Sequence, residues 1–337
     1  MIRVAINGFG RIGRLVFRIM EEDPNFDVVA INDLTDAEQL AYLLKYDTSH
    51  RTYRVNDITS GEDYIAVSDH KVKVYSERDP KNLPWGQLDI DIVFECTGLF
   101  VDYEKAYDHI TAGAKKVLIS APGKGDMKTI VYNVNNHVLD GTESVISAAS
   151  CTTNCLAPVA DVLDRTFGIV KGYMTTVHAY TNDQAVLDVA HKKGIRARRG
   201  RAAAANIVPS STGAARAVGL VLPQLKGKLD GSALRVPTTT GSVVDLTVEL
   251  KRHVSVEEIN EAFRQNTNET LGFTMDPIVS SDIIGSYHGS LVDGLLTSIL
   301  EVDGKQLVKV VAWYDNEMSY SAQMVRTALY IGNLMNK

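Results

Sequence analysis

The first 33 residues constrain the fold more strongly than any other stretch of this chain. The apolar run Ile2–Ile6 predicts a short strand, and the pattern G-x-G-x-x-G follows it at Gly8–Gly13. Apolar side chains then recur at the spacing of an amphipathic helix. A second apolar run, Asp27–Ile31, leads to Asp33, which lies 20 residues beyond the last glycine. Strand, glycine turn, helix, strand and acid in this order are typical of a dinucleotide-binding βαβ unit.

Each part of this unit has a physical role. Gly8, Gly10 and Gly13 allow a tight turn and let the backbone approach a pyrophosphate, which the start of the helix then binds. The Asp33 carboxylate can accept hydrogen bonds from an adenosine ribose and would repel a 2′-phosphate, so NAD is the predicted cofactor. Two alternatives stay open: a glycine-rich turn that binds nothing, and helix capping by Asp33 beside a predicted capping box at Thr35–Glu38.

Length and composition limit the class of protein. A chain of 337 residues predicts two domains, and 45% hydrophobic and 23% charged residues fit a soluble globular protein. Three cysteines cannot build a disulfide framework, which favours a reducing compartment and a cytoplasmic location. We expect no signal peptide, because the chain starts with a strand pattern, and no membrane helix. The formal net charge of −6 argues against a dedicated nucleic-acid-binding protein.

The charge is unevenly distributed along the chain. Between Val189 and Leu229 there is no acidic residue, but there are nine lysines and arginines. Such a segment is either a solvated basic loop or a site for small anions such as phosphates. Within it, Ser211–Ala215 predicts a glycine-containing turn into a helix, which would present backbone amides to an anion.

Two further apolar runs belong to the first half of the chain. Ile90–Phe94 and Lys116–Ser120 predict strands of the same parallel sheet. Small and polar residues, among them Thr97 and Ser120, follow or end these strands. Because ligands bind at the carboxyl ends of parallel strands, we expect a bound cofactor to lie there. Cys96, in the same position, is interpreted as a packed core residue rather than a reactive one.

A short polar run, Ser150–Cys155, opens a predicted helix near the middle of the chain. A cysteine in the first helical turn lies at the positive end of the helix dipole, which favours the thiolate. Cys151 is therefore a candidate nucleophile, with a buried small apolar side chain as the alternative. The strand predicted at Gly172–Ala179 delivers His178, and histidine titrates nearest neutrality. His178 is the candidate base, with a structural histidine as the alternative.

The remaining patterns predict an α+β second half. Val243–Leu250 and Leu307–Trp313 alternate as strands of an antiparallel sheet. Ser255 and Glu258 have the spacing of a capping box, and Met318–Leu334 is an amphipathic last helix. No group of histidines and cysteines has metal-ligand spacing, so we expect no metal.

Four sequence blocks carry a resemblance to a known family. They are Asn7–Arg14 (NGFGRIGR), Ala149–Pro158 (ASCTTNCLAP), His178–Thr181 (HAYT) and Trp313–Glu317 (WYDNE). In this order they closely resemble phosphorylating glyceraldehyde-3-phosphate dehydrogenase. The likeness runs from Met1 to the C-terminal helix, and it includes Ser211–Ala215 and Arg235–Thr238.

The resemblance implies an α/β fold with an N-terminal Rossmann-type doubly wound sheet and an α+β catalytic domain with a mainly antiparallel sheet. The expected boundaries are residues 1–150 for the NAD-binding domain, completed by a C-terminal helix at 318–337, and residues 151–317 for the catalytic domain. The resemblance also implies a homotetramer.

The family pattern, carried residue by residue, implies site roles. Cys151 would be the nucleophile and His178 the base, while Thr181 and Arg235 would hold the phosphate of the substrate. The positions that match cofactor contacts are Gly8, Gly10, Arg11, Ile12, Gly13, Asp33, Arg78, Thr97, Ser120 and Asn316. The positions that match inorganic-phosphate contacts are Ser150, Thr152, Thr212 and Gly213, with an arginine of the basic loop.

The sequence departs from the family pattern in two places. Ala148 stands where many relatives have asparagine, two residues before Ser150 in the turn that leads to the nucleophile. The arginines of the basic loop are unusually spaced, so that the phosphate arginine could be Arg196 or Arg198. We assign Arg198.

The activity that the resemblance implies is the oxidation of glyceraldehyde 3-phosphate to 1,3-bisphosphoglycerate with NAD and inorganic phosphate, as in glycolysis. The reaction would pass through a thiohemiacetal and a thioester on Cys151. A close alternative is an erythrose-4-phosphate dehydrogenase on the same fold, although a complete set of phosphate ligands favours phosphorylation. A different alternative is a secondary binding role, as an adhesin or on a nucleic acid, through the basic loop.

Overall fold

The computed structural model describes residues 1–335 and divides into two compact units. The first unit contains Met1–Ser150 and the described residues from Ser321 onward, and the second contains Cys151–Tyr320. The last helix, α8 (Met318–Met335), therefore begins in one unit and continues in the other. Residues 336 and 337, which belong to the predicted C-terminal helix, lie outside the described residues.

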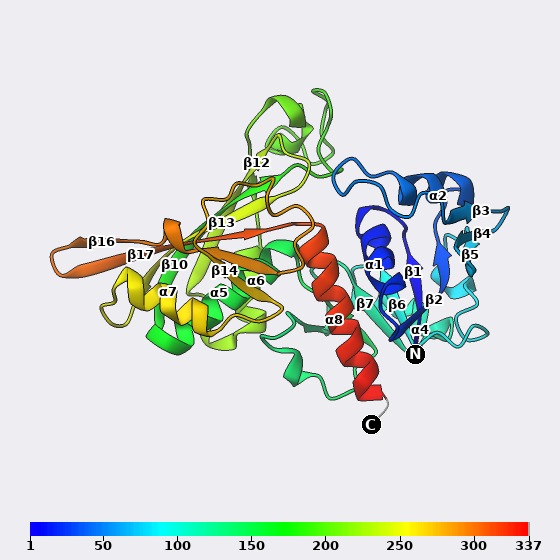
Figure 1. The fold of residues 1–337 in the computed structure, drawn as a ribbon, viewed down its shortest axis with the longest axis horizontal. Helices are drawn as coiled ribbons and strands as arrows, with labels where there is room; N and C mark the ends of the chain where they lie inside the picture. Colours follow the sequence, from blue (N-terminus) through cyan, green and yellow to red (C-terminus); the bar gives the residue numbers. More distant parts are fainter. Residues whose placement is uncertain (336–337) are drawn as a thin grey trace. The chain divides into compact units, whose positions relative to one another are not determined.

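A nine-stranded sheet forms the centre of the first unit (Figure 1). Its order is β3-β4-β5-β2-β1-β6-β7-β9-β8. In the part of this order that runs β5-β2-β1-β6-β7-β9-β8, every pair of neighbouring strands is parallel. β6 and β7 are buried along their whole length, as strands of a parallel sheet covered on both faces should be. The strands are β1 (Ile2–Asn7), β2 (Phe26–Asn32), β3 (Ile58–Ser60), β4 (Tyr64–Val67), β5 (His70–Tyr75), β6 (Ile92–Glu95), β7 (Lys116–Ile119), β8 (Lys128–Thr129) and β9 (Val145–Ser147).

The helices of the first unit include α1 (Arg11–Glu21), α2 (Ala37–Lys45), α3 (Tyr103–Ala106) and α4 (Asp108–Thr111). Helix α2 is capped by Asp36, whose side chain accepts a hydrogen bond from the amide of Gln39 at 2.9 Å. The predicted capping box at Thr35–Glu38 is therefore wrong, because the helix begins one residue later. An aspartate at the N-cap position serves the same purpose as a threonine.

The second unit is built on an eight-stranded sheet of order β11-β12-β10-β13-β17-β15-β14, with β16 paired to β17. Five of its strand pairs are antiparallel, while β10 runs parallel to β12 and β14 runs parallel to β15. The strands are β10 (Ile169–Ala179), β11 (Val208–Ser211), β12 (Leu229–Val236), β13 (Ser242–Leu250), β14 (Leu271–Thr274), β15 (Ser290–Asp293), β16 (Ser298–Val302) and β17 (Lys305–Tyr314).

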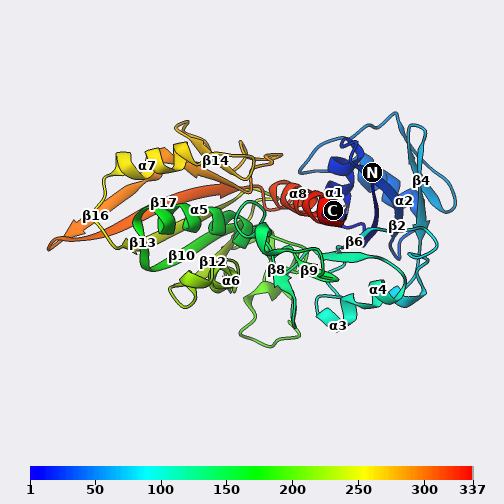
Figure 2. The same cartoon turned by 90° about the horizontal axis from the view of Figure 1, so that it is seen from below.

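Three helices pack with this second sheet (Figure 2). Helix α5 (Cys151–Phe167) contacts β10, β13, β15 and β17; α6 (Ala214–Val221) contacts β12, and α7 (Val256–Gln265) contacts β14. At the start of α7, the Ser255 hydroxyl accepts a hydrogen bond from the Glu258 amide at 3.1 Å, and the Glu258 carboxylate accepts one from the Ser255 amide at 2.8 Å. The predicted capping box at this helix is confirmed.

The predicted fold class is confirmed by these two sheets, one rich in parallel pairs and one mainly antiparallel. Across the described part of the chain, no helix combines the length and the apolar character that a membrane span requires.

Candidate active site

The glycine turn after β1 brings backbone segments unusually close together. Gly8 has a φ of 92°, in the left-handed region that favours glycine, and a Cβ on it would lie 2.7 Å from the amide nitrogen of Thr97. A Cβ on Gly13 would lie 2.1 Å from the Gly8 carbonyl oxygen. Around Gly10, by contrast, no described atom outside Gly10 and its two chain neighbours would lie within 4 Å of a Cβ. The turn is thus closed toward the sheet and open at Gly10.

The start of α1 has the chemistry of an anion site. Gly10 is the N-cap residue and offers no side-chain acceptor, and the first turn of the helix contains no acidic residue. The positive end of the helix therefore adjoins the glycine turn without a carboxylate from its own first turn. An uncapped helix start next to a turn of this shape fits the pyrophosphate of NAD.

Asp33 holds this turn in place from the end of β2. Its carboxylate accepts a hydrogen bond from the amide of Phe9 at 2.7 Å and another from the amide of Thr35 at 3.0 Å. Each carboxylate oxygen can accept more than one hydrogen bond, so the side chain still has capacity for ribose hydroxyls. Asp33 therefore combines a local structural role with the chemistry of a ribose ligand.

Arg11 ties the start of α1 to the segment that follows α2. Its guanidinium donates to the Asp47 carboxylate at 2.5 and 3.0 Å. Burial of Asp47 opposes ionisation, but hydrogen bonds from Arg11 and from the His50 amide outweigh it and lower the pKa of Asp47 to about 2. The pair is consequently charged at physiological pH.

The remaining first-unit candidates lie at the carboxyl ends of three strands. Arg78 follows β5 and is exposed, Thr97 follows β6, and Ser120 follows β7. Since β1, β2, β5, β6 and β7 are parallel, these residues lie at the same edge of the sheet as Gly8 and Asp33. Burial raises the pKa of the neighbouring Cys96 thiol, which suits a packed side chain.

Cys151 and His178 meet in the second unit. Cys151 is the first residue of α5, and His178 is the penultimate residue of β10. Although 27 residues separate them in sequence, the Sγ of Cys151 lies 3.4 Å from the Nε2 of His178. The pair therefore has the geometry of a thiol that can pass its proton to an imidazole.

Strand register places Arg235 beside His178. The two residues are direct partners in the parallel pair of β10 and β12. The Nη1 of Arg235 lies 2.8 Å from the Nδ1 of His178, and it donates to the Ala179 carbonyl at 3.0 Å and to the Thr181 hydroxyl at 3.2 Å. A fixed positive charge thus stands next to the Cys–His pair.

The surroundings of His178 keep its ring neutral. Burial and, secondly, the Arg235 guanidinium lower the pKa of His178 to about 3. The Nδ1 lies 2.6 Å from the Ala179 carbonyl oxygen, and a hydrogen there leaves a lone pair on Nε2, toward Cys151. If Arg235 donates to Nδ1 instead, the ring hydrogen is on Nε2, which then acts as a donor toward Cys151. The site can therefore hold His178 as an acceptor or as a donor.

Burial also acts on the nucleophile. It raises the pKa of the Cys151 thiol, while the Arg235 charge and hydrogen bonds involving Thr152 lower that pKa only in part. The thiolate that a helix start favours is thus opposed by desolvation. Both shifts favour a thiol beside a neutral imidazole, so that ionisation of the sulfur requires proton transfer to Nε2.

Tyr314 joins this site, although the sequence patterns did not single it out. Its buried hydroxyl lies 2.9 Å from the Thr152 hydroxyl and 2.8 Å from the Thr176 hydroxyl. Its ring meets the His178 ring edge-on, with centroids 5.9 Å apart. The side chain thereby joins α5, β10 and β17 and fixes the plane of the imidazole. Its place in the WYDNE block was the available signal.

The Arg235 guanidinium has binding capacity left over. Its Nε is buried and has no hydrogen-bond partner among the described residues. A buried donor without an acceptor is costly unless a ligand supplies one, and a guanidinium prefers an anionic oxygen. Thr181 presents its hydroxyl next to this group, between Arg235 and Asp183.

A second group of anion-binding candidates gathers where two helices start. Thr212 and Gly213 precede α6, and the Thr212 hydroxyl accepts from the Ala214 amide at 3.1 Å. The Thr153 hydroxyl donates to the Ala214 carbonyl at 3.4 Å, which joins the first turn of α5 to the first turn of α6. Ser150 directly precedes α5, and Thr152 is buried within its first turn. Two helix starts next to each other favour an anion.

Among the arginines considered in the basic loop, Arg199 contacts β11 and the segment after β10. Arg199 is half-buried; it pairs with Asp183, and its Nε donates to the Ser210 hydroxyl at 3.4 Å. Burial, Arg235 and, more weakly, Arg199 lower the pKa of His178. These contacts favour Arg199 over Arg198 as the phosphate arginine, whereas the family pattern led us to assign Arg198.

The other two candidate arginines have different surroundings. Arg198 is exposed and lines a separate hollow with His191 and Ile195, and Arg196 is exposed as well. Both precede Arg199 by a few residues in the same irregular loop, so spacing alone could not distinguish the three side chains.

Asn316 lies in the second unit, two residues before α8. Its Oδ1 accepts a hydrogen bond from the Ser242 hydroxyl at 2.8 Å. The buried Asp315 carboxylate accepts hydrogen bonds from the amides of Glu317 and Met318 at 2.9 and 3.0 Å, which caps the helix. The Asn316 side chain is consequently held at a rigid junction.

Comparisons with known proteins agree with this architecture. A family described as "Glyceraldehyde 3-phosphate dehydrogenase, NAD binding domain" matches residues 2–103, and one described as "Glyceraldehyde 3-phosphate dehydrogenase, C-terminal domain" matches residues 150–316. The chain is 59% identical over 334 residues to the glyceraldehyde-3-phosphate dehydrogenase of Clostridium pasteurianum and 58% identical to that of Clostridium acetobutylicum, and each match covers 99% of both chains. It is 56% identical over 335 residues to that of Streptococcus pyogenes, again with 99% of both chains covered.

Together the fold, the glycine turn and these matches define an NAD-dependent oxidoreductase. The chain belongs to the glyceraldehyde-3-phosphate dehydrogenase family.

Proposed function

We propose that the chain oxidises D-glyceraldehyde 3-phosphate to 1,3-bisphosphoglycerate with NAD and inorganic phosphate, as in glycolysis. The observation that carries this proposal is the contact of 3.4 Å between the Cys151 sulfur and the His178 Nε2, with the Arg235 guanidinium next to the same ring. This arrangement combines a nucleophile, a neutral base and a fixed positive charge, which are the groups that aldehyde oxidation through a thioester requires.

In the first step, the Cys151 sulfur adds to the aldehyde carbon and its proton passes to His178. With its hydrogen on Nε2, His178 then donates to the oxyanion of the thiohemiacetal and later accepts the hydroxyl proton. Tyr314 keeps the imidazole plane fixed during these exchanges, since its ring packs edge-on against it. The neutral ring favours this role, because an imidazolium could not accept the thiol proton.

When bound, NAD would supply the hydride acceptor, and loss of hydride from the thiohemiacetal carbon would leave a thioester on Cys151. The proposed NAD ligands of the first unit are Gly8, Gly10, Arg11, Ile12, Gly13, Asp33, Arg78, Thr97 and Ser120. The start of α1 would bind the pyrophosphate and Asp33 the ribose. Asn316 of the second unit is the remaining proposed NAD ligand.

Inorganic phosphate then attacks the thioester carbon, and the bond to the Cys151 sulfur breaks. The proposed ligands of this phosphate are Ser150, Thr152, Arg199, Thr212 and Gly213. The adjoining starts of α5 and α6 support this, because both direct the positive ends of helix dipoles to one place. Thr181 and Arg235 would hold the phosphate of the substrate, with the unsatisfied Arg235 Nε as support.

We further propose a homotetramer in the cytoplasm. Large apolar side chains are exposed on the chain by itself, among them Val186 at 81%, Leu187 at 73%, Ile195 at 101% and Leu300 at 62%. Side chains of this kind favour association with other copies. The three free cysteines favour a reducing compartment. Light scattering of the purified protein tests the assembly, and a monomer at assay concentrations would contradict it.

A steady-state assay with two aldehydes tests the reaction. We expect rapid NADH formation from glyceraldehyde 3-phosphate, and a strict requirement for inorganic phosphate. Erythrose 4-phosphate serves as the competing substrate. A higher kcat/KM with erythrose 4-phosphate, or a rate without any phosphate requirement, would contradict the proposal.

A further inference from the structure

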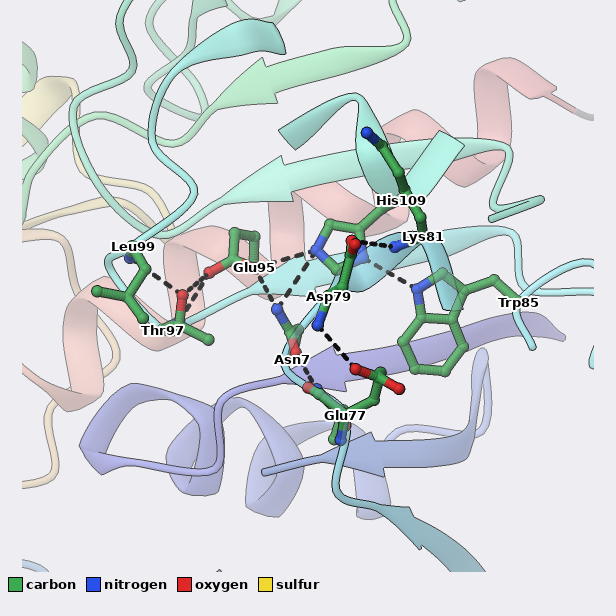
Figure 3. A network of polar contacts seen from close by, with 10 residues as sticks. Asn7, Glu77, Asp79, Lys81, Trp85, Glu95, Thr97, Leu99 and His109 are labelled. Carbon is green, nitrogen blue, oxygen red and sulfur yellow. Dashed lines mark hydrogen bonds and ion pairs between the residues drawn. The ribbon is translucent and has the colours of Figure 1, made fainter. Parts of the chain in front are cut away.

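A polar network lies inside the first unit, where the proposed reaction does not use it (Figure 3). The Glu95 and His109 side chains are completely buried, and the His109 Nε2 lies 3.1 Å from a Glu95 carboxylate oxygen. Asn7 and Trp85 complete the centre of the network, with exposed fractions of 1% and 0%. Buried polar side chains in this number call for a physical reason, because apolar side chains would fill the same space at lower desolvation cost.

The position of the hydrogen on the His109 ring follows from its partners. The Trp85 Nε1 lies 2.9 Å from the His109 Nδ1, and an indole nitrogen can only donate. The Nδ1 is therefore the acceptor, and the ring hydrogen of neutral His109 is on Nε2, which faces Glu95. The ring thus accepts a hydrogen bond from Trp85 and donates one to the Glu95 carboxylate, which fixes its orientation.

Four donors converge on the Glu95 carboxylate. One oxygen accepts from the Asn7 amide group at 2.5 Å and from His109, and the other accepts from the backbone amide of Thr97 at 2.8 Å and from the Thr97 hydroxyl. None of these four donors is a lysine or arginine. A carboxylate satisfied entirely by hydrogen bonds imposes geometry on every donor, since moving one would leave a buried lone pair unpaired.

The network continues from Asn7 to two more segments. The Asn7 Oδ1 accepts from the Asn32 amide group at 2.7 Å. Asn32 in turn donates to the Glu77 carbonyl at 2.9 Å and accepts from the Glu77 amide at 2.8 Å. The ends of β1, β2 and β6 and the segment after β5 are therefore joined through side chains as well as through the sheet.

Each of these segments carries a proposed NAD ligand next to its network residue. Asn7 directly precedes Gly8, Asn32 precedes Asp33, and Glu77 precedes Arg78. Glu95 lies two residues before Thr97, which it binds directly. The network therefore lies one peptide unit behind the surface that would contact the dinucleotide, on four separate segments.

We propose that Glu95 and His109 are positioning residues for NAD, which set the spacing of these four segments from inside the sheet. The inference rests on the proposed placement of NAD at this edge. When the network is broken, the strands remain paired, but the four segments at their ends lose their fixed positions relative to one another. NAD affinity should then fall more than the folding of the unit explains.

The test compares two replacements of His109 by titration calorimetry with NAD alone. His109→Gln keeps one donor and one acceptor at similar separation, whereas His109→Leu keeps the volume and removes both. We expect His109→Leu to raise the Kd for NAD by about tenfold and His109→Gln by less than about threefold, as the loss of one or two buried hydrogen bonds predicts. The kcat at saturating NAD and the KM for the aldehyde should stay near their original values.

Ile65→Ala is the matched control. Ile65 is fully buried in β4, outside the network, and its truncation lowers the stability of the same unit. We expect this variant to melt at a lower temperature with an unchanged Kd for NAD. An equal loss of NAD affinity in Ile65→Ala would overturn the proposal, because general destabilisation would then explain the effect. An unchanged Kd in folded His109→Leu would overturn it too.

A milder variant covers the case in which His109→Leu does not fold. Trp85→Phe retains an aromatic ring and removes the donor to the His109 Nδ1, so that the ring hydrogen is no longer fixed on Nε2. A Kd for NAD raised by about threefold or more supports the proposal, and an unchanged Kd contradicts it. Since binding is measured without aldehyde or phosphate, failure of the proposed reaction would not affect either result.

Discussion

Cys151 and Cys155 lie four residues apart on the same helix but in different surroundings. Cys151 contacts His178, whereas the Cys155 sulfur is completely buried near the Ser290 hydroxyl and the Ala312 carbonyl, at 3.6 and 3.8 Å. We expect Cys151→Ser to lose at least about three orders of magnitude in turnover, because a hydroxyl is a far weaker nucleophile than a thiolate. NAD binding should be retained. Steady-state NADH formation measures the first effect and calorimetry the second.

Cys155→Ser is the control for this experiment. The substitution places a hydroxyl in a polar niche that already contains a hydroxyl and a carbonyl, so we expect a folded and substantially active enzyme. Equal losses of turnover in the two variants would contradict the assignment of separate roles.

Arg199 and Arg198 form a matched pair in the basic loop. Arg199 is half-buried against Asp183 and Ser210, and Arg198 is exposed. We expect Arg199→Ala to raise the KM for inorganic phosphate by at least about tenfold, since a charge-assisted hydrogen bond is lost. Arg198→Ala should leave this KM nearly unchanged. The reverse order of effects would identify Arg198 as the phosphate ligand.

The buried His178 makes stability depend on pH. Its pKa is lowered to about 3 in the folded protein from an ordinary value of 6.5. Between these two values the unfolded chain binds a proton at this residue and the folded chain does not, so the free energy of unfolding falls as the pH falls from 6.5 toward 3. In His178→Asn this contribution is absent. Over this pH range we expect the Tm of the original protein to fall more steeply on acidification than the Tm of His178→Asn. Parallel curves of Tm against pH for the two proteins would contradict the lowered pKa of His178.

At the scale of the element, the start of α7 provides a test that avoids the active site. Ser255 and Glu258 satisfy each other's backbone amides, and neither belongs to the catalytic or binding candidates. Ser255→Ala should lower the free energy of unfolding by about 1 kcal/mol, because one amide at the helix start loses its acceptor. Denaturant unfolding measures this loss, and kcat should not change. A variant as stable as the original would show that the capping box contributes nothing to folding.

Elements with strong sequence signals could be predicted, but an element boundary at which two neighbouring residues could each cap the helix could not. The strands β1, β2, β13 and β17 follow from apolar runs, and α7 from its capping box. At α2 the sequence Thr35-Asp36 offers two adjacent caps, and local spacing favoured the wrong one. The Thr35 amide instead donates to the Asp33 carboxylate at 3.0 Å, a contact that the capping-box pattern does not report.

The same distinction applies to the candidate site. Cys151 and His178 stand at element ends, where short sequence patterns are informative. Arg199 stands in an irregular loop, where its direction depends on Asp183 and Ser210. The raised pKa of the Cys151 thiol also depends on burial, which no helix-start pattern reports. Sequence patterns therefore indicated the chemistry, while the fold determined its electrostatic setting.

At the scale of the whole molecule, each unit has a chemical task of its own. The first has the glycine turn and the parallel sheet edge that we propose for NAD, and the second has the Cys–His pair next to the groups that we propose to bind anions. If Ser150, Thr152, Arg199, Thr212 and Gly213 gather inorganic phosphate, the thioester on Cys151 is held ready for that acceptor. Water is abundant but is not aligned for attack, and orientation can contribute several kcal/mol to such a step.

Rapid mixing of enzyme, glyceraldehyde 3-phosphate and NAD without inorganic phosphate tests this central claim most directly. The account predicts a burst of roughly one NADH per active site, followed by slow turnover, because the thioester accumulates on Cys151. Addition of phosphate should then restore rapid production that saturates with its concentration. A steady rate that is indifferent to phosphate would show that water is the acceptor and would contradict the phosphorylating reaction.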